Sequence, residues 1–488
     1  MVRNFFKNIR FLSFAEIVLK LKFLVVIPVL TRYFGTINYG AWSQVGVLAT
    51  TLIPFLVMGT DSAIVRYLPG EEEGKKKRFF SAWFIFLSVV FILVCAVLCF
   101  FRSGIASLFF GNSVQLEGLI PLAAATLFIN MLLNTERIWF RVNNDARTYS
   151  FIAISQSALG VIAILVALFT KAGLYRIVLY GIMADFIVSV WVLAKIWKTY
   201  GMSVPNFSIL PSLLKYGIPL VPAGFAIWAL NYMDRFFLIK YASLAAVGIY
   251  SLAYSLGYAL IQIIVNPIWA MYPNCASELY NTKDMATLQK LFDYSVKLIL
   301  FIMLPFIVMA LVLGRQILAL VATTEFMSGA PVIAIVACGY LFLMLSSYYE
   351  VSLGLAHKQY LSTVSAVAAC VINFFLNIIL VPKYAILGAA FATFLSFLSQ
   401  LLMSYMFEKR RAMILKTDVR FVMRISAVSV VTGLVAYGLM LCVNGPGAFQ
   451  GVFVVISSTM VYLGVALLFK VINIDFVKSA VIFLKESF

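Results

Sequence analysis

Two lysines and an aspartate stand within long apolar segments, where a charge is costly and usually serves function. Lys20 and Lys22 lie about 12–15 Å into the segment 12–33 at 1.5 Å per helical residue. Glu16 stands four residues before Lys20, a spacing at which two side chains of one helix can pair. Asp185 lies at a similar depth in another such segment. These positions favour a polar cavity among membrane helices, with an ion pair between helices as the structural alternative.

Further ionisable residues lie toward the ends of apolar segments, where charged side chains often anchor a helix at the membrane interface. They are Arg32, Asp234 and Arg235 at one end of their segments, and Asp61, Arg66, Glu136, Arg137 and Glu350 at the other. Each can be an anchor or line a cavity. Arg235 is a candidate contact for an anionic substrate, and Asp61, together with Asp185, is a candidate for ion coupling. The amides of Gln262, Asn266, Asn373 and Asn377 can line a cavity or join helices by hydrogen bonds.

The sequence motifs of common catalytic sites are absent. There is no G-x-x-x-x-G-K-[ST] phosphate loop, no H-E-x-x-H and no G-x-S-x-G. The one histidine, His357, lies beside Lys358 in a short polar turn, and the six cysteines have no metal-binding spacing. The segments 102–117 and 314–329, the longest outward connections, are too short for a catalytic domain. We therefore expect no enzyme, no cofactor and no metal site.

The composition is that of a membrane protein. The chain is 63% hydrophobic and 11% charged, against about 25% charged residues in soluble domains. Its mean hydropathy is +1.02. Apolar stretches long enough to cross a bilayer lie near 12–33, 39–60, 79–101, 118–138, 149–170, 177–197, 216–239, 247–270, 291–313, 330–351, 361–381, 386–407, 419–442 and 451–472. The sequence therefore predicts an all-α polytopic protein with about fourteen transmembrane helices.

The net charge of +18 is explained by topology rather than by nucleic acid. With the N-terminus in the cytoplasm, most Lys and Arg residues fall in cytoplasmic segments, including the runs 75–78 and 409–424. The basic start of the chain precedes an apolar run, as in a signal peptide, but charges interrupt that run and no cleavage site follows. We expect an uncleaved first helix, both termini in the cytoplasm, and a location in the cell (inner or plasma) membrane.

A weak internal repeat divides the chain. Thr31–Phe34 resembles Asp234–Phe237, and Gly40–Ser43 resembles Gly248–Ser251. Other pairs of similar short segments follow in the same order, and the two members of each pair are separated by a nearly constant number of residues. This predicts two six-helix lobes, 1–205 and 206–407, related by an axis along the membrane normal, and an additional helix pair with a cytoplasmic tail at 408–488. Transporters built from such repeats bind substrate between the two halves.

Three sequence blocks resemble a known family. They are PVLTRYFG at 28–35, followed by Asn38–Gly40; KYGIPLVP at 215–222, followed by NYMDRF at 231–236 and VGIYS at 247–251; and NIILVPKY at 377–384, ending in Leu387–Ala390. In order and spacing they resemble the Wzx-type O-antigen and exopolysaccharide flippases of the multidrug/oligosaccharidyl-lipid/polysaccharide exporter superfamily.

The resemblance implies a V-shaped pair of lobes around a cavity. It implies alternating access that moves a polyprenyl-pyrophosphate-linked oligosaccharide to the outer leaflet without ATP hydrolysis. Arg32 matches a cavity arginine of related lipid II flippases, so the resemblance assigns it to the substrate site. Lys20, Lys22 and Arg235 are the other candidates for that site, on the ground of their charge within or at the ends of apolar segments. Implied partners are membrane lipids, a coupling proton or sodium ion, and a downstream polysaccharide polymerase. A drug or cation antiporter of the same superfamily and a membrane sugar polymerase or ligase are the alternatives.

Overall fold

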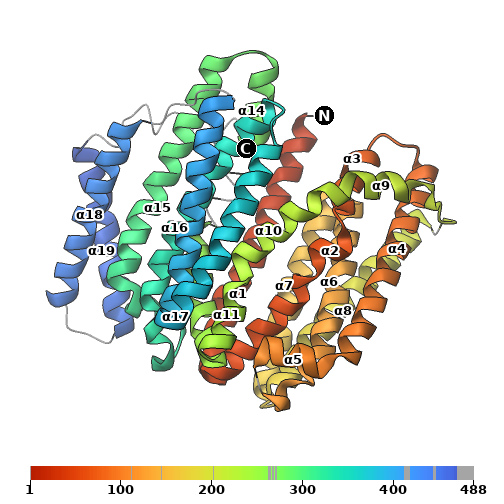
Figure 1. The fold of residues 1–488 in the computed structure, drawn as a ribbon, viewed down its shortest axis with the longest axis horizontal. Helices are drawn as coiled ribbons and strands as arrows, with labels where there is room; N and C mark the ends of the chain where they lie inside the picture. Colours follow the sequence, from red (N-terminus) through yellow and green to blue (C-terminus); the bar gives the residue numbers. More distant parts are fainter. Residues whose placement is uncertain are drawn as a thin grey trace. The chain divides into compact units, whose positions relative to one another are not determined.

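The computed structural model describes residues 2–469 except 112, 144, 202, 262–264, 266–268, 270–271, 412–417 and 443–446. The side chains of residues 2–25, 114, 200, 260, 411 and 447–452 also lie outside the description. Within the described part every regular element is a helix (Figure 1). The predicted all-α membrane fold is confirmed. The chain divides into two compact units, Met1–Gly248 and Ile249–Phe488, which are described separately.

Unit 1 is built on five long helices and several short ones. Its elements are α1 (Val2–Thr51), α2 (Ile53–Val57), α3 (Thr60–Tyr67), α4 (Glu73–Phe100), α5 (Arg102–Phe110), α6 (Leu119–Val142), α7 (Ala146–Phe169), α8 (Leu174–Tyr200), α9 (Leu210–Gly217), α10 (Val221–Tyr232), α11 (Asp234–Tyr241) and the first turn of α12 (Leu244–Leu260). Helix α6 packs against α1, α4 and α8, and is therefore the central helix of this unit. Its buried face includes Leu127, Trp139 and Phe140.

Unit 2 contains the rest of α12 and two layers of long helices. Its elements are α14 (Tyr272–Asn281), α15 (Met285–Val321), α16 (Ala330–Leu355), α17 (Tyr360–Arg411), α18 (Val419–Cys442) and α19 (Gly447–Leu468). Helix α15 contacts α16 on one side and both α18 and α19 on the other. Asp284 caps α15 by accepting a hydrogen bond from the amide of Thr287 at 3.0 Å. The C-terminal pair is therefore packed onto the body of unit 2 through α15.

The described residues of each of the fourteen predicted apolar segments are mainly helical, but the helix boundaries differ. Ten helices are long and apolar enough to span a membrane among the described residues, and two shorter apolar helices cover 244–259 and 453–468. The predicted segments 361–381 and 386–407 lie in the single element α17, which kinks at Ala385 (φ 45°). Likewise α1 covers the first predicted segment and much of the second, and has non-helical backbone at Gly35 (φ 66°). Each of the two elements therefore consists of two helices separated by a break, and both breaks fall between predicted segments.

Helices α1 and α12 cross at two glycines, Gly40 and Gly248, which the predicted repeat pairs with each other. A Cβ atom on Gly40 would lie 2.3 Å from the carbonyl oxygen of Leu244, and one on Gly248 would lie 2.1 Å from that of Thr36. Gly40 and Thr36 are the repeat counterparts of Gly248 and Leu244, so the contact is self-complementary, as at a two-fold axis. Only glycine lets the two backbones approach this closely.

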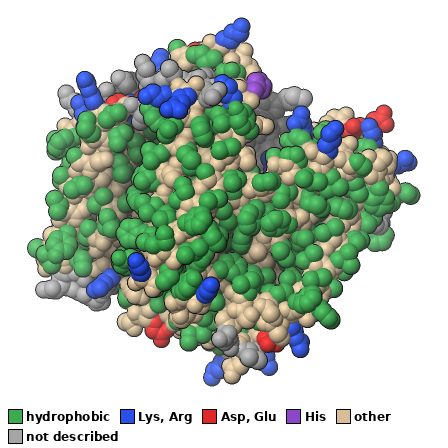
Figure 2. All heavy atoms as spheres, viewed as in Figure 1, with side chains coloured by type: hydrophobic (Ala, Val, Ile, Leu, Met, Phe, Trp, Pro, Cys, Tyr) green, Lys and Arg blue, Asp and Glu red, His purple; other side chains and the backbone are tan. Residues whose placement is uncertain are grey.

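Apolar side chains cover much of the surface of both units (Figure 2). Phe169 is 87% exposed, Met460 68% and Leu434 67%. In Figure 2 the Lys and Arg side chains gather near the ends of the helices rather than along their middles. Large contiguous apolar surface is stable only against lipid or another protein. Together with the long apolar helices, this makes the chain a multi-pass membrane protein.

Candidate transport site

The predicted cationic pair lies on the first helix of unit 1. Lys20 and Lys22 belong to α1, but their side chains are outside the described residues. Helix α1 begins at Val2, ten residues before the predicted segment, so the helix includes the basic start of the chain. The predicted depth of 12–15 Å was measured from residue 12, and the exposure of both lysines to a cavity stays a prediction.

The two predicted arginines have different surroundings. Arg32 is exposed, while its neighbour Thr31 is buried and donates its hydroxyl to the carbonyl of Ile27 at 2.9 Å. Arg235 is 4% exposed at the start of α11. Arg235 was predicted as a residue near a helix end, and the structure places it in the interior of unit 1.

Contacts from the α10–α11 junction hold the Arg235 guanidinium. Its Nη1 donates to Asp234 Oδ1 at 3.1 Å and to the carbonyl oxygen of Asn231 at 2.7 Å. The guanidinium carbon lies 5.1 Å from the centre of the Tyr232 ring. A buried charge is tolerable when it is paired and hydrogen-bonded in this way. Because the Asp234–Arg235 pair carries no net charge, Arg235 attracts a substrate anion less strongly than an arginine without an acidic partner would.

The two acids predicted for ion coupling are half-buried. Asp61 lies in the first turn of α3, where its Oδ1 accepts from the amide of Ser62 at 2.8 Å. Asp185 lies on α8, one turn before the buried Ser189. Because residues four apart share a helix face, Asp185 projects toward the same side of α8 as Ser189.

A buried carboxylate in unit 1 was predicted only as a helix-end residue. Glu136 on α6 is fully buried, and its Oε1 accepts a hydrogen bond of 2.5 Å from Ser189 Oγ on α8. Its Oε2 is buried without a hydrogen-bond partner among the described residues. The next residue, Arg137, donates instead to Gln156 on α7. Glu136 is thus an interior acid between α6 and α8, rather than an interfacial anchor.

Closer than Glu136 to the C-terminal ends of α6 and α8, a lysine joins α7 and α8. Lys195 Nζ donates to Thr148 Oγ1 at 2.7 Å, and Thr148 in turn donates to Asp145 Oδ2 at 2.6 Å. The ammonium also lies 5.9 Å from the centre of the Phe140 ring, four residues after Glu136 on α6. This polar path links the end of α8 to the turn before α7.

Unit 2 holds a half-buried acid in a richer set of donors. Glu350 Oε1 on α16 accepts hydrogen bonds from Gln400 Nε2 at 3.1 Å, Ser404 Oγ at 3.0 Å and Ser365 Oγ at 3.4 Å. All three donors belong to α17, which packs along α16. Glu408, also on α17, is buried and accepts from Ser352 on α16 at 3.3 Å. The interface between α16 and α17 therefore carries one buried and one half-buried carboxylate near one end.

The amides expected to line the second half of a cavity lie inside unit 2. Asn373 and Asn377 on α17 are fully buried, and Asn377 Nδ2 donates to both the carbonyl and the side-chain oxygen of Asn373 at 2.9 Å. Asn373 Nδ2, Asn377 Oδ1 and Thr393 Oγ1 have no hydrogen-bond partner within the described part of the chain. The predicted Gln262 and Asn266 lie outside the described residues.

Unit 2 also has an apolar pocket of about 230 Å³. Its lining comes from α15, α16, α17 and α18: Val296, Leu300, Leu345, Tyr349, Leu401, Leu402, Tyr405 and Val422. Such a lining suits hydrocarbon and offers nothing to a pyrophosphate. For the described residues, no group of three or more His, Cys, Asp or Glu side chains is placed to hold a metal ion.

The fold matches solved transporters across nearly the whole chain. The lipid II flippase MurJ in an inward closed conformation superposes with a TM-score of 0.76 at 18% identity, covering 95% of this chain and 98% of that one. An inward-facing multidrug MATE transporter of the MOP superfamily has a TM-score of 0.63 at 14% identity, covering 82% and 94%. The predicted all-α fold class is therefore confirmed, and the fold is the one seen in MurJ and MATE structures.

Two archaeal proteins are similar in sequence. An uncharacterized membrane protein of Methanocaldococcus jannaschii is 23% identical over 368 residues, 70% of this chain and 71% of that protein. A probable low-salt glycan biosynthesis flippase, Agl15 of Haloferax volcanii, is 23% identical over 220 residues, 45% of this chain and 46% of that protein. Residues 29–331 match the family described as Polysaccharide biosynthesis protein. Because this match spans more than half of the 488 residues, the chain belongs to the polysaccharide biosynthesis protein family.

Proposed function

We propose that this protein flips a polyprenyl-pyrophosphate-linked oligosaccharide from the cytoplasmic to the outer leaflet. The observation that carries the proposal is the fold shared with a lipid II flippase over 95% of the chain, within a polysaccharide biosynthesis family. The similarity to a probable glycan biosynthesis flippase supports the same substrate class. An O-antigen or exopolysaccharide repeat unit is the proposed cargo, and the cell (inner or plasma) membrane with both termini cytoplasmic is the proposed setting.

The transport step requires the two lobes, 1–205 and 206–407, to open alternately toward each side of the membrane. The pyrophosphate would meet the cations of the first lobe, Lys20, Lys22 and Arg32, with Arg235 from helix α11. A pyrophosphate with about two negative charges gains about 4–5 kcal/mol per 100 mV on moving outward across an inside-negative membrane. This is sufficient to bias flipping without ATP. A proton or sodium ion bound at Asp185 or Asp61 is the proposed additional drive.

A drug or cation antiporter is the second candidate function, favoured by the fold similarity to a multidrug MATE transporter. An antiporter of cations requires a net anionic cavity, whereas the lipid-linked pyrophosphate requires a cationic one. Growth of the deletion strain in the presence of cationic drugs distinguishes them, because only the loss of an antiporter sensitises the cell. Deletion of a membrane sugar polymerase or ligase would instead leave lipid-linked sugar that has reached the outer leaflet but has not been polymerised or transferred.

Deleting the gene in its own host tests the proposal. Loss of the flippase should leave lipid-linked oligosaccharide accumulated on the cytoplasmic leaflet, where an added impermeant lectin or oxidant cannot reach it in intact cells. Surface polysaccharide should fall in parallel and return when the gene is supplied on a plasmid. Normal surface polysaccharide with no accumulated lipid-linked sugar would contradict the proposed function.

A further inference from the structure

Two hydrogen-bonded carboxylates, the fully buried Glu136 and the half-buried Glu350, occupy corresponding places in the two units. Glu136 lies six residues before the end of α6, and Glu350 lies five residues before the end of α16, the helix that begins 211 residues later. Each is hydrogen-bonded by a residue of a long helix further along the chain, Ser189 of α8 and Gln400 of α17. Ser189 and Gln400 both lie eleven residues before the ends of their helices. A glutamate and its hydrogen-bond donor therefore stand at matching helix positions in both halves.

In unit 1, one of the two oxygens of the Glu136 carboxylate accepts no hydrogen bond from the described residues. Ser189 donates to Glu136 Oε1, while Oε2 is buried with no partner among the described residues. The carboxyl is fully buried on a central helix, next to the aromatic residues Phe140 and Trp139. An ionised carboxylate with one bare oxygen is costly there, and a proton on Oε2 removes that charge.

In unit 2 the surroundings can satisfy both protonation states. Ser365, Gln400 and Ser404 donate to the ionised carboxylate of Glu350. The side-chain oxygen of Gln400, which is 4% exposed, is itself buried without a hydrogen-bond partner in the described part of the chain. A protonated Glu350 becomes a donor, and an amide oxygen is the acceptor that such a donor needs. The cluster is therefore built for a group that gains and loses a proton.

No ion pair within 4.0 Å joins either carboxylate to a basic side chain in the described residues. The charged groups on this half of α6 and of the helices packed against it are Arg137, Arg141, Asp61, Arg66, Glu73, Lys75, Lys76, Lys77, Arg78, Arg147, Asp185, Lys195 and Lys198; around α16 they are Glu278, Lys290, Asp293, Lys297, Glu408, Lys409 and Arg410. Of these, Arg137 is bonded to Gln156, Lys195 to Thr148, and Lys297 to two aspartates. With these three cations bonded elsewhere, a proton is the simplest counter-charge for Glu136 and for Glu350.

We propose that Glu136 and Glu350 are a pair of proton-binding sites, one in each half, whose protonation is coupled to the transport cycle. Each carboxylate takes up one proton to become a neutral acid and releases it again, with no other bond made or broken. Asp185, one turn from Ser189 on α8, is placed to pass protons toward Glu136. The coupling rests on the proposed flippase function, whereas the binding of protons does not.

A sodium ion is the competing occupant. Sodium is held by several oxygen atoms, and Ser189 is the one hydroxyl that contacts Glu136 in the described residues. Around Glu350 in unit 2, Ser365, Ser404 and the Gln400 amide supply more oxygen atoms, so a sodium site there would break the correspondence between the halves. Sodium dependence is therefore an outcome that the test must be able to reveal.

The direct test is infrared difference spectroscopy of the purified full-length protein during a pH titration in sodium-free buffer. The wild type should show carbonyl bands of protonated carboxylic acids that disappear as the pH rises. Glu136→Gln and Glu350→Gln should each remove one band, because the amide keeps the shape and cannot titrate. Glu117→Gln is the matched control, since the Glu117 carboxylate accepts from Ser103 at 3.0 Å in an exposed hydrogen bond. Unchanged bands in both the Glu136 and the Glu350 variant, or bands abolished by sodium alone, would overturn the proposal.

Transport measured on the same variants tests the coupling separately. Each variant should lose the pH dependence of flipping, while the control keeps it. If wild-type protein does not flip lipid-linked sugar at all, the proposed function fails, but the infrared titration still decides whether the sites bind protons. Where a glutamine variant does not fold, Ser189→Ala or Gln400→Leu should shift the midpoint of the corresponding band instead of removing it. If the pH midpoint of the band does not move in these variants, Glu136 and Glu350 are not the proton-binding sites.

Discussion

Alanine at the glycine crossing of α1 and α12 should force the two helices apart. On Gly248 the new Cβ would lie 2.1 Å from the carbonyl oxygen of Thr36 and 3.0 Å from the amide nitrogen of Gly40. Carbon and oxygen in contact normally stay about 3.3 Å apart or more, so the backbones must separate by about 1 Å. The obstacles are backbone atoms, which cannot rotate away. We expect a cost of about 1–3 kcal/mol, less the ~1 kcal/mol that alanine gains over glycine in a helix.

The same helix offers a matched control. Gly46 lies on α1, six residues after Gly40, and a Cβ there would meet nothing within 4 Å. Gly46→Ala should therefore be neutral or stabilising by up to ~1 kcal/mol. Gly40→Ala, whose Cβ would lie 2.3 Å from the Leu244 carbonyl oxygen, should destabilise like Gly248→Ala.

Thermal unfolding of detergent-solubilised variants, followed by intrinsic fluorescence, measures these differences. Because the first alanine already separates the helices, the double variant Gly40→Ala/Gly248→Ala should lose less stability than the sum of the single losses. A crossing at which Gly40→Ala behaves like Gly46→Ala, or at which the two effects simply add, would refute this account of how α1 meets α12.

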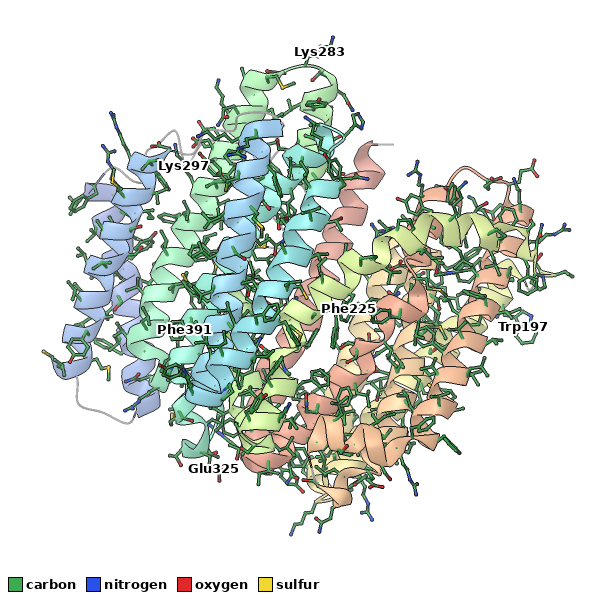
Figure 3. All side chains as sticks on the ribbon, in the orientation of Figure 1. Trp197, Phe225, Lys283, Lys297, Glu325 and Phe391 are labelled. Carbon is green, nitrogen blue, oxygen red and sulfur yellow. The ribbon has the colours of Figure 1, made fainter. Side chains whose placement is uncertain are left out.

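Three further predictions concern single charged residues. The ammonium of Lys297 (3.0 Å away; Figure 3) and backbone amides hold the pKa of Asp418 below its usual range, so Asp418→Asn should cost about 0–1 kcal/mol of stability near neutral pH. That contribution is present above the unfolded-state pKa and is lost as pH falls through the lower folded pKa, which an acid titration of thermal stability checks. Asp185→Asn should retain substrate binding but turn over slowly, with a flattened pH profile of flipping; wild-type activity with an unchanged profile would reject coupling there. Lys20→Ala and Lys22→Ala should reduce flipping at least tenfold at unchanged protein abundance, and full activity in both would remove them from the substrate site.

Much of the fold could be predicted from composition, because a helix that crosses lipid needs an uninterrupted apolar stretch. The described residues of all fourteen predicted segments are accordingly mainly helical. The breaks between helices within α1 and α17, at Gly35 and Ala385, also fall between predicted segments, because each interrupts an apolar stretch at a short connection.

The candidate site was harder to predict. Glu136 and Glu350 lie near the ends of apolar segments, where the sequence also allows interfacial anchors. In a soluble protein the apolar stripe of a helix would show which face is buried. Here the lipid-facing side is as apolar as the interior, so periodicity does not separate the two. The spacing of Glu136 and Glu350 within the repeat, and serines or glutamine on the partner helices, were the available signals.

Flipping by the purified protein tests the central claim most directly. The full chain is reconstituted into liposomes with a fluorescent polyprenyl-pyrophosphate-linked oligosaccharide on both leaflets, and an impermeant quencher or sugar-specific enzyme is added outside. Protein-containing vesicles should lose about all of the signal as inner-leaflet lipid is brought out, whereas protein-free vesicles and vesicles with heat-inactivated protein should lose about half. An inside-negative potential should speed the loss. If the protein-containing vesicles retain the same protected half as the empty ones, this chain is not a flippase for lipid-linked sugars.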